Sequence, residues 1–458
     1  MKLLPLLVKL VVAVGARLAE GTDVCGGVPL SAVLPRPADR SRVSYAVMFD
    51  AGSTGTRIHV YAFVHTHADA FPVLDNETFH SVKPGLSAHI HSPETAAQSV
   101  RTLLKVAESA VPRQRWESTP VLLRATAGLR LMSADKAQAL LRQVQRVFDD
   151  SPFLVPYNSV GIMDGTSEGI LAWITVNFLS GHLHAHNKQT VGILDLGGAS
   201  TQITFLPKLT DCSVEKAAPD DDVVTVDVLN SSFELYTHSY LGNGLMSARL
   251  STLRAHSVSG PDFKSPCLPK KFRGEWSFGG ETYQVSGDPE GASGYKACYE
   301  NVLKTVKGII CQPLHHHHPH LEAQKTLFYA FSFYFDRAVE AHLIGTHTPS
   351  LLLNFDSHYG DWAPPSFTDE IHGGRLRVRD FTRSAKEVCK ETSEAVFSVN
   401  PFLCLDLTYI SCLLTDGLGF RDDAPLRLSK KVNNMEASWA LGATLAHFEN
   451  LHLHHRGR

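Results

Sequence analysis

The sequence predicts an α/β protein made of two related lobes that face each other across a cleft. The chain has 458 residues, which at roughly 150 residues per domain gives two or three folding units. Hydrophobic residues make up 43% of it and charged residues 19%, values that are ordinary for a folded globular protein. One strand–turn–strand pattern occurs twice, over residues 45–63 and again over residues 191–205. Each copy would open one lobe.

Each copy of the pattern begins with an apolar strand that ends in an aspartate, Asp50 in the first copy and Asp195 in the second. A turn with glycines and hydroxyl side chains follows, AGSTG in one copy and LGGAS in the other, and a β-rich return strand completes the copy. One copy alone would be typical of an ordinary glycine-rich hairpin. Two copies with matched aspartates favour a more specialised loop.

The residue types in these turns suit the binding of phosphate groups. Glycines let backbone N–H groups come close to an anion and point at it, and serine and threonine hydroxyls add further donors. An aspartate at the end of the strand can hold a hydrated divalent cation beside the phosphates. Two such loops facing each other would clamp a polyphosphate between the lobes.

A third segment, LRATAGLR at residues 123–130, follows a short β-like run at residues 120–122. It would bring Thr126 and a backbone turn to the cleft, where the hydroxyl could contact phosphate. Taken by itself, the segment is more typical of a plain connection from a strand to a helix.

A fourth segment, residues 162–179, predicts a strand, a tight turn and a buried helix. We expect Thr166 or Ser167 near the N-cap of this helix and Glu168 in its first turn. A glutamate there could simply complement the helix dipole. It could also act as a general base that takes a proton from an attacking water.

Charge and the N-terminus restrict the partners and the compartment. The formal net charge is −3, which argues against a nucleic-acid-binding protein. Residues 1–20 predict a signal peptide, with Lys2 before an apolar stretch that Lys9 interrupts; a core helix or a short membrane anchor is the alternative. No later segment is long and apolar enough to span a membrane. Sequons at Asn76 and Asn230 support passage through the secretory pathway as glycosylation sites.

The eight cysteines contain no CxxC pair with zinc-ligand spacing. In an oxidising compartment, Cys267 with Cys298 and Cys389 with Cys404 could form local disulfides. The alternative is that all of the cysteines are buried thiols. The remaining cysteines have no obvious partner: Cys25, Cys212, Cys311 and Cys412.

Four motifs in order carry a resemblance to a known family: FDAGSTGTR, LRATAGLRL, IMDGTSEGILAW and LDLGGASTQITF. They resemble the apyrase-conserved regions of the nucleoside triphosphate diphosphohydrolase (apyrase) family. The likeness is strongest to the soluble nucleoside diphosphatase branch of the endoplasmic reticulum, Golgi and secreted fluids. The segments KPGLSA, SPFLVP, YTHSYLG and SWALGAT extend it over roughly residues 45–450.

The resemblance implies a two-lobed, actin-like (ribonuclease H-like) α/β fold with the active site between the lobes. Lobe I would comprise residues 44–165 with a C-terminal return at about 433–452, and lobe II residues 166–432. The resemblance also supports the disulfides Cys267–Cys298 and Cys389–Cys404.

The resemblance assigns roles to the residues of the motifs. Glu168 would be the catalytic base, Gln202 would position the nucleophilic water, and Asp50 with Asp195 would orient the water ligands of Ca²⁺ or Mg²⁺. An aromatic side chain, Phe333 or Tyr334, would stack on the nucleobase. The phosphates would be held by Ser53, Thr54, Gly55, Thr56, Thr126, Gly197, Gly198, Ala199 and Ser200.

The implied reaction is hydrolysis of nucleoside diphosphates such as UDP and GDP, with triphosphates hydrolysed less well. A water activated by Glu168 would attack the terminal phosphorus in line, assisted by the metal. The implied setting is glycoprotein processing in the secretory pathway, in the endoplasmic reticulum lumen, the Golgi or after secretion, by a monomer. The alternatives are an actin-like sugar kinase, which would use an acceptor-site aspartate as its base, and a non-catalytic nucleotide-binding member.

Three features depart from the pattern or lie outside it. Residues 345–372 read as an atypical Pro-rich insertion just after the aromatic segment, which puts nucleobase selectivity in question. The histidine run at residues 315–320 is expected to be a solvated loop in preference to a metal site. The acidic run at residues 220–222 is expected to be a solvated turn.

Overall fold

The computed structural model describes residues 43–65, 72–184, 189–207, 222–229, 231–256, 262–306, 326–345, 373–391, 400–449 and 453–454. Several sequence predictions lie outside these ranges: the signal peptide at 1–20, Cys25, Cys212, Cys311, the sequon residue Asn230, the histidine run at 315–320 and residues 346–372 of the expected insertion. Within the described ranges, the structure contains no helix whose length and hydropathy would let it cross a lipid bilayer.

The first lobe is built on a five-stranded sheet in the order β3-β2-β1-β4-β5. Its strands are β1 (Val43–Ala51), β2 (Thr56–Val64), β3 (Val73–Val82), β4 (Val121–Ala125) and β5 (Val160–Ile162). Two amphipathic helices, α2 (Pro93–Ala110) and α4 (Ala134–Asp149), cover one face, where Val47 and Phe49 of β1 join their apolar side chains in a common core. Period-two alternation in β1 sends the next residues, such as Met48, to the opposite face.

The second lobe is built on an eight-stranded sheet in the order β14-β15-β13-β6-β7-β9-β8-β18. Its strands are β6 (Gly192–Leu196), β7 (Ser200–Phe205), β8 (Val223–Val228), β9 (Ser231–Leu241), β13 (Phe328–Ser332), β14 (Gly373–Arg377), β15 (Pro425–Ser429) and β18 (Leu453–His454). The helices of its outer core are α6 (Leu245–His256), α7 (Tyr295–Val306), α8 (Phe333–Glu340), α9 (Val378–Glu391) and α10 (Leu403–Cys412), the last continued by a π-helical turn at Leu413–Gly417.

The two sheets repeat one topology. In the first, β1 pairs antiparallel with β2 and parallel with β4, and the strands beyond them are β3 and β5. In the second, β6 pairs antiparallel with β7 and parallel with β13, and the strands beyond them are β9 and β15. The predicted fold class, an α/β two-lobed actin-like fold, is confirmed.

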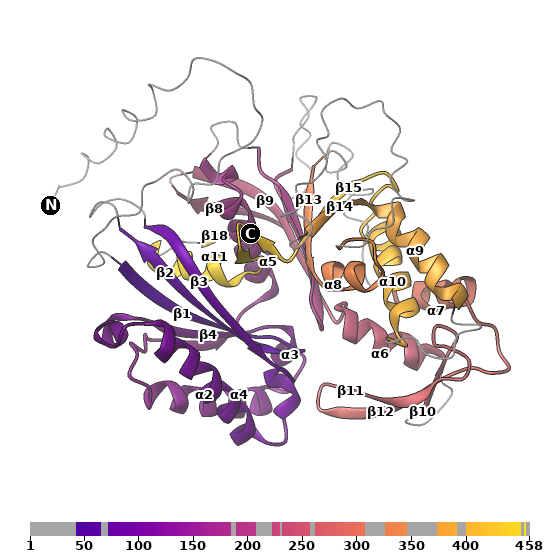
Figure 1. Cartoon of the computed structure of the whole chain (residues 1–458), viewed down its shortest axis with the longest axis horizontal. Helices are drawn as coiled ribbons and strands as arrows, with labels where there is room; N and C mark the ends of the chain where they lie inside the picture. The colour runs from indigo at the N-terminus through magenta and orange to yellow at the C-terminus, as the bar shows by residue number, and fades with distance from the viewer. Residues whose placement is uncertain are drawn as a thin grey trace, which may run out of the picture.

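Two helices lie between the sheets and join the lobes (Figure 1). Helix α5 (Gly165–Leu179) is apolar on every side, as expected for a helix buried all round, and α11 (Ala440–Glu449) packs beside it. Their side chains share one core with the inner faces of both sheets, including Met48 of β1 and Ile193 of β6. The short hairpin of β16 (Lys431–Val432) and β17 (Met435–Glu436) precedes α11, and the Glu436 N–H donates to Glu77 Oε2 of β3 at 2.7 Å.

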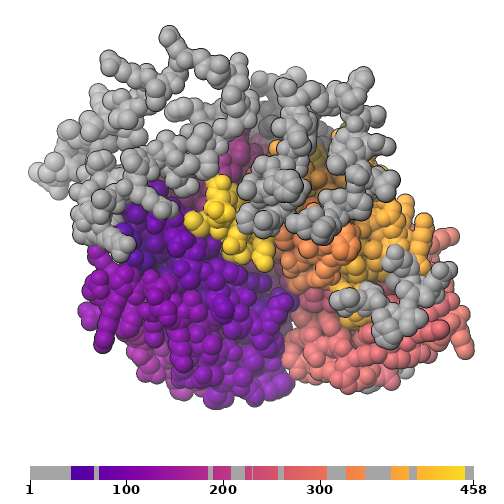
Figure 2. Space-filling view, viewed as in Figure 1, coloured from indigo at the N-terminus to yellow at the C-terminus, as the bar shows by residue number. Residues whose placement is uncertain are grey.

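The lobes also meet outside this core. Figure 2 shows the first lobe, in purple, and the second lobe, in salmon and orange, meeting along a seam at the lower centre of the view. A small sheet of β10 (Asp262–Ser265), β12 (Glu281–Gly287) and β11 (Arg273–Phe278) belongs to the second lobe. Glu281, at the start of β12, has its Oε1 3.9 Å from Nε2 of His91 in the first lobe. The exact residue limits proposed for the lobes, 44–165 with 433–452 and 166–432, stay a prediction.

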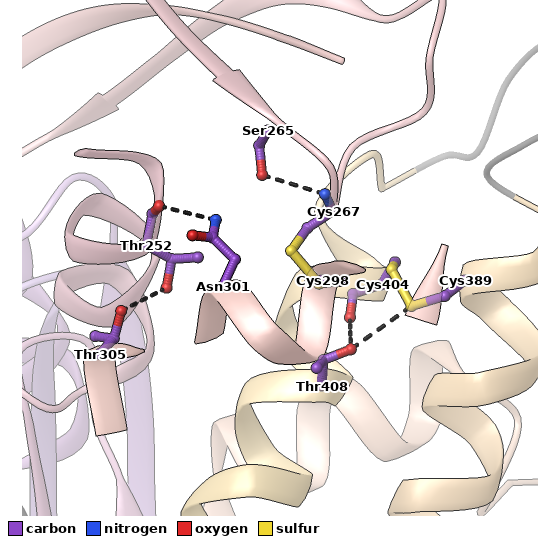
Figure 3. Close-up of a disulfide and its surroundings, with 9 residues drawn as sticks. All are labelled: Thr252, Ser265, Cys267, Cys298, Asn301, Thr305, Cys389, Cys404 and Thr408. Carbon is purple, nitrogen blue, oxygen red and sulfur yellow. Dashed lines mark hydrogen bonds between the residues drawn. A yellow bond between two sulfur atoms is a disulfide. The ribbon is translucent and has the colours of Figure 1, made fainter. Parts of the chain in front are cut away.

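Both predicted disulfides are present, and both lie in the second lobe (Figure 3). Cys267–Cys298 ties the segment after β10 to α7, and Cys389–Cys404 ties α9 to α10. The sulfurs of Cys298, Cys389 and Cys404 lie within 4.8 Å of one another, so the two bridges form one buried cluster. Cys412, on α10, is a buried free thiol, which agrees with the absence of an obvious partner in the sequence.

Candidate functional site

Two loops that end equivalent strands face each other between the lobes. We call Gly52–Gly55, between β1 and β2, the first loop and Gly197–Ser200, between β6 and β7, the second loop. Each is closed by the same backbone bond, from the N–H of its first residue to the carbonyl of its last, at 3.0 Å in both loops. A Cβ added to Gly198 would lie 2.4 Å from Ser53 Oγ. Only glycine therefore lets the second loop come this close to the first.

The remaining predicted phosphate ligands surround these loops. Thr56 and Ser200 are buried at the edge of each hairpin, whereas Ser53 and Thr54 are half-buried and lie beside Gly198 of the second loop. Thr126 begins the short helix α3 (Ala127–Arg130), and its N–H donates to the carbonyl of Ala51 beside the first loop at 3.3 Å. The first loop, the second loop and the segment at residues 123–130, which the sequence predicts at the cleft, therefore lie close together.

Asp50 and Asp195 end their strands as predicted and are 6% and 7% exposed. Arg57 Nη1 donates to one oxygen of Asp50 at 2.8 Å. The other oxygen, Oδ1, of each aspartate is buried and has no hydrogen-bond partner within the described part of the chain. Buried carboxylate oxygens without partners are costly, so both side chains fit the hydration shell of a divalent cation.

Burial raises the pKa of Asp195 to about 6, and the nearby charge of Asp50 adds to the shift. A hydrogen bond from the Ser332 side chain and the charge of Arg57 oppose it. Ser332 ends β13 with a left-handed φ of 57°, a conformation rarely adopted by serine. Sequence reasoning missed this contact, because it joins two strands that are adjacent in the sheet and distant in the chain.

Glu168 lies in the first turn of α5, as predicted, and is 6% exposed. Thr166 and Ser167 lie near the N-cap, as predicted, but the N-cap itself is Asp164, whose side chain accepts the Ser167 N–H at 2.8 Å. Asp164 is favoured because aspartate is a strong N-cap residue and the φ and ψ of the cap are extended. The helix therefore begins at Gly165 and brings Glu168, in its first turn, beside Gln202 of β7.

Two side chains hold Glu168 Oε2. Arg130 Nη2 lies 2.8 Å from it and Gln202 Nε2 lies 3.2 Å from it. Burial raises the pKa of Glu168 to about 8. The charge of Arg130 lowers this pKa, and the charges of Asp195 and Asp50 raise it. A carboxylate with this pKa is protonated and deprotonated near neutral pH, as a general base requires.

Gln202 is fixed by its amide nitrogen and leaves its amide oxygen free. Its Nε2 lies 2.8 Å from Ser200 Oγ and 2.9 Å from Ser239 Oγ, in addition to Glu168. Its Oε1 is buried and accepts no hydrogen bond from the residues the structure describes. An acceptor of this kind beside a general base suits the second hydrogen of a bound water.

Comparison with known proteins gives the family of the chain. The family model described as GDA1/CD39 (nucleoside phosphatase) family matches residues 37–456. The chain belongs to this family. It is 51% identical to ectonucleoside triphosphate diphosphohydrolase 5 of Gallus gallus over 90% of this chain and 89% of that protein. It is 49% identical to nucleoside diphosphate phosphatase ENTPD5 of Homo sapiens, over 94% of this chain and 93% of that one.

More distant members of the GDA1/CD39 family and one solved structure extend the likeness. Ectonucleoside triphosphate diphosphohydrolase 6 of Mus musculus is 43% identical over 89% of this chain and 83% of that protein. A crystal structure of nucleoside triphosphate hydrolases from Neospora caninum has a TM-score of 0.55, with 15% identity over 88% of this chain and 92% of that chain. This structural likeness is to the fold.

Arg130 is the main site residue that sequence reasoning missed in this family member. Besides Glu168, its guanidinium donates to the Met163 carbonyl at 2.9 Å and to Ser200 Oγ at 3.2 Å. It therefore links α3 of the first lobe to α5 and to the second loop. Its position in the LRATAGLR segment was a usable signal, because a cation close to a predicted general base affects the pKa of that base.

The two aromatic candidates for the nucleobase differ in exposure. Tyr334 is completely buried in the core of the second lobe. A ring without an exposed face cannot stack on a ligand, so its burial argues against that role. Phe333, at the start of α8, is only partly buried and packs at the edge of the same core.

Two further predicted positions lie away from the site. Asn76, of the first sequon, is exposed on β3, which suits a glycosylated side chain. Asp222 is the only residue of the acidic run at 220–222 that the structure describes, and its Oδ1 lies 2.7 Å from His238 Nδ1.

Proposed function

We propose that this member of the GDA1/CD39 nucleoside phosphatase family hydrolyses nucleoside diphosphates, UDP and GDP among them, to the monophosphate and phosphate, and hydrolyses triphosphates less well. One observation carries the proposal. A buried glutamate with a pKa near 8 is held by a cation and an amide beside two facing glycine-rich loops. The human relative is named nucleoside diphosphate phosphatase.

The two loops are proposed to hold the diphosphate. The backbone N–H groups and hydroxyls of Ser53, Thr54, Gly55 and Thr56 would bind the terminal phosphate, with Thr126 beside them. The second loop, Gly197 to Ser200, would bind from the opposite lobe. Donors fixed in advance at a site from which water is excluded stabilise charge as it develops, without reorganisation in the transition state.

Glu168 is proposed to take one proton from the attacking water, whose oxygen forms the new bond to the terminal phosphorus. The bond from that phosphorus to the bridging oxygen breaks in line, and the nucleoside monophosphate leaves. Gln202 Oε1 would accept the second hydrogen of the water and so fix its direction. Arg130 would hold Glu168 in place and keep its pKa from rising further.

A divalent cation fits beside the phosphates. The buried Oδ1 atoms of Asp50 and Asp195 would hold it through water ligands. When bound, such a cation neutralises charge on the phosphoryl oxygens. Ca²⁺ and Mg²⁺ both suit oxygen ligands, and phosphate release measured with each ion would distinguish them.

Phe333 is proposed to stack on the nucleobase, because its ring is partly exposed and directly follows Ser332, which contacts Asp195. Tyr334 is completely buried and therefore has no ring face on which a nucleobase could stack.

We place the enzyme in the secretory pathway, in the endoplasmic reticulum lumen, the Golgi or secreted, as a monomer that serves glycoprotein processing. Two buried disulfides favour an oxidising compartment, and the exposure of Asn76 is compatible with glycosylation.

The direct test is phosphate release by the purified mature protein. UDP, GDP, ADP and UTP would be compared in the presence of Ca²⁺, Mg²⁺ or a chelator, with UMP as the negative control. We expect release from the diphosphates, less from UTP, and none with the chelator. Transfer of phosphate from ATP to a sugar would instead identify a kinase. No release from any nucleotide would identify a non-catalytic member.

A further inference from the structure

A buried ion cluster lies in the second lobe, away from the proposed catalytic groups. Asp406 of α10 has no exposed surface. Arg249 of α6 contacts both of its oxygens, with Nε 2.6 Å from Oδ1 and a second, shorter contact from Nη2 to Oδ2. Arg337 of α8 donates through Nη1 to Oδ2 at 3.1 Å. One carboxylate thus joins three helices.

A buried ion cluster of this kind is weak evidence for a role in stability. The cost of removing the charges from water can exceed their attraction, and apolar side chains of similar volume often stabilise a core equally well. The cluster therefore says less about stability than about position: it fixes α6, α8 and α10 relative to one another.

Helix α6 holds the second loop. The N–H of Leu245, its first residue, donates to the Gly197 carbonyl at 2.9 Å, and the next two N–H groups donate to the Gly198 carbonyl at 2.9 and 3.0 Å. A Cβ added to Gly244 would lie 2.3 Å from the Ala199 nitrogen. The second loop therefore rests directly on the start of α6 and must move with it.

Helix α10 fixes this same segment at two points. Tyr409, completely buried, donates its hydroxyl to the Asn243 carbonyl just before α6 at 2.7 Å. One turn earlier on α10, Asp406 binds Arg249 inside α6, and Arg249 lies over the ring of Phe402, 4.4 Å from its centroid. The start of α6 therefore cannot shift without breaking a contact to α10.

Helix α8 carries the other side of the cluster. The Arg337 guanidinium lies 5.5 Å from the centroid of the Phe333 ring and also pairs with Glu340 at 2.8 Å. Arg337 therefore touches Asp406 with one nitrogen and supports Phe333 with the plane of its guanidinium group.

We propose that Asp406 is a positioning residue that sets the separation between the second loop, carried by α6, and Phe333, carried by α8. A diphosphate on the loop and a nucleobase on Phe333 belong to one ligand, so a fixed separation selects a nucleotide over a diphosphate without a base. The inference rests on the proposed function, because it takes the loop as the phosphate subsite and Phe333 as the base subsite.

The test compares two substrates in Asp406→Asn. One is UDP, and the other is methyl diphosphate, which has the same phosphates and no base. We expect the ratio of kcat/KM for UDP to that for methyl diphosphate to fall about tenfold, mostly through the KM for UDP, because misplaced subsites no longer bind both ends of UDP at once. Asp423→Asn, in the exposed Arg421–Asp423 pair of the same lobe, is the control and should leave the ratio unchanged.

Two further variants separate positioning from folding. Arg337→Met leaves the Arg249–Asp406 pair intact and should lower the ratio if Asp406→Asn does not fold. The triple variant Arg249→Met, Asp406→Leu, Arg337→Met removes the charges altogether and should keep most of the thermal stability while the ratio stays low.

An unchanged ratio in folded Asp406→Asn or Arg337→Met would overturn the inference while leaving the proposed function in place. A wild-type enzyme that releases no phosphate from UDP would overturn the proposed function, and this inference with it.

Discussion

The hairpins β1–β2 and β6–β7 share one backbone arrangement, and each carries an aspartate near the end of its first strand. They differ in what contacts that aspartate. The strand register places Asp50 opposite Arg57 and Asp195 opposite Gln202. In the first lobe the cross-strand partner is a cation, which binds the aspartate directly at 2.8 Å. In the second lobe the partner is an amide, which turns away to Glu168 and two serines.

This difference suggests a division of the proposed chemistry between the lobes. In the first lobe, Arg57 of β2 pairs with Asp50 and compensates its charge. The second leaves Asp195 without a paired cation in the described structure, and burial raises its pKa to about 6. The amide that replaces a cation at this position is free to orient a water beside the base. We therefore propose that the first hairpin mainly holds the phosphates and that the second positions the attacking water, because their cross-strand partners, Arg57 and Gln202, differ.

The largest effect that probes this comparison is expected from the aspartates. Asp195→Asn should lower kcat/KM by roughly 10²–10³-fold, because it removes a charge that would hold the cation where charge develops. Asp50→Asn should weaken activation by Ca²⁺ or Mg²⁺ less than Asp195→Asn does, since the positive charge of Arg57 stays beside Gly52 of the first loop. Metal titrations of phosphate release would check this. Equal shifts of the metal midpoint in both variants would mean that the two loops are equivalent.

A smaller effect is expected at the cross-strand partners. Gln202→Leu should lower kcat by about ten- to a hundredfold with little change in KM for UDP, since it removes an orienting contact that matters in the transition state. Arg57→Met, the matched change in the first lobe, should act mainly on KM. Steady-state kinetics of the two variants would check the split, and a reversed pattern would assign the reacting role to the first loop.

The pH profile sharpens the comparison further. Glu168 must be deprotonated to accept a proton, so kcat/KM should rise with pH and level off above about 8. Arg130 lowers the pKa of Glu168 by its positive charge. Arg130→Met should therefore move the rise to higher pH, by about one unit. A profile that falls over this range, or that moves to lower pH in the variant, would contradict the assignment of the base.

The smallest effect on activity is expected from the disulfides, which lie in the second lobe and include no residue of either loop. Replacing Cys389 and Cys404 with serine should lower the free energy of unfolding by about 3 kcal/mol, since a loop of this length is no longer closed. The kcat for UDP should change less than about twofold. Denaturant unfolding would check the free energy of unfolding, and steady-state kinetics would check kcat. Hydrogen exchange should show that protection is retained in β1 to β5. A large loss of activity in the folded variant would contradict this separation.

Much of the site was predictable because it is local in sequence. Each loop, its aspartate and its return strand lie within one short stretch, and Glu168 follows a recognisable helix start. The disulfide Cys389–Cys404 also closes a short loop, since its cysteines are separated by 15 positions in the sequence.

The parts that could not be predicted depend on residues distant in the chain. Arg130 reaches Glu168 across 38 residues, and Arg249 reaches Asp406 across 157. No periodicity marks such pairs, because each residue alone resembles a solvated surface charge. Tyr334 was a candidate stacking residue because its segment is aromatic throughout; only the packing of α8 shows which ring is buried.

The proposed mechanism depends most directly on Glu168, and the substitution Glu168→Gln tests it. Glutamine keeps the size of the side chain and removes its ability to accept a proton. At pH 8 with saturating Ca²⁺ or Mg²⁺, we predict that UDP still binds with nearly unchanged affinity, while phosphate release slows by about 10²–10⁴-fold. Release at the wild-type rate by the folded variant would contradict the central claim that this buried carboxylate activates the water.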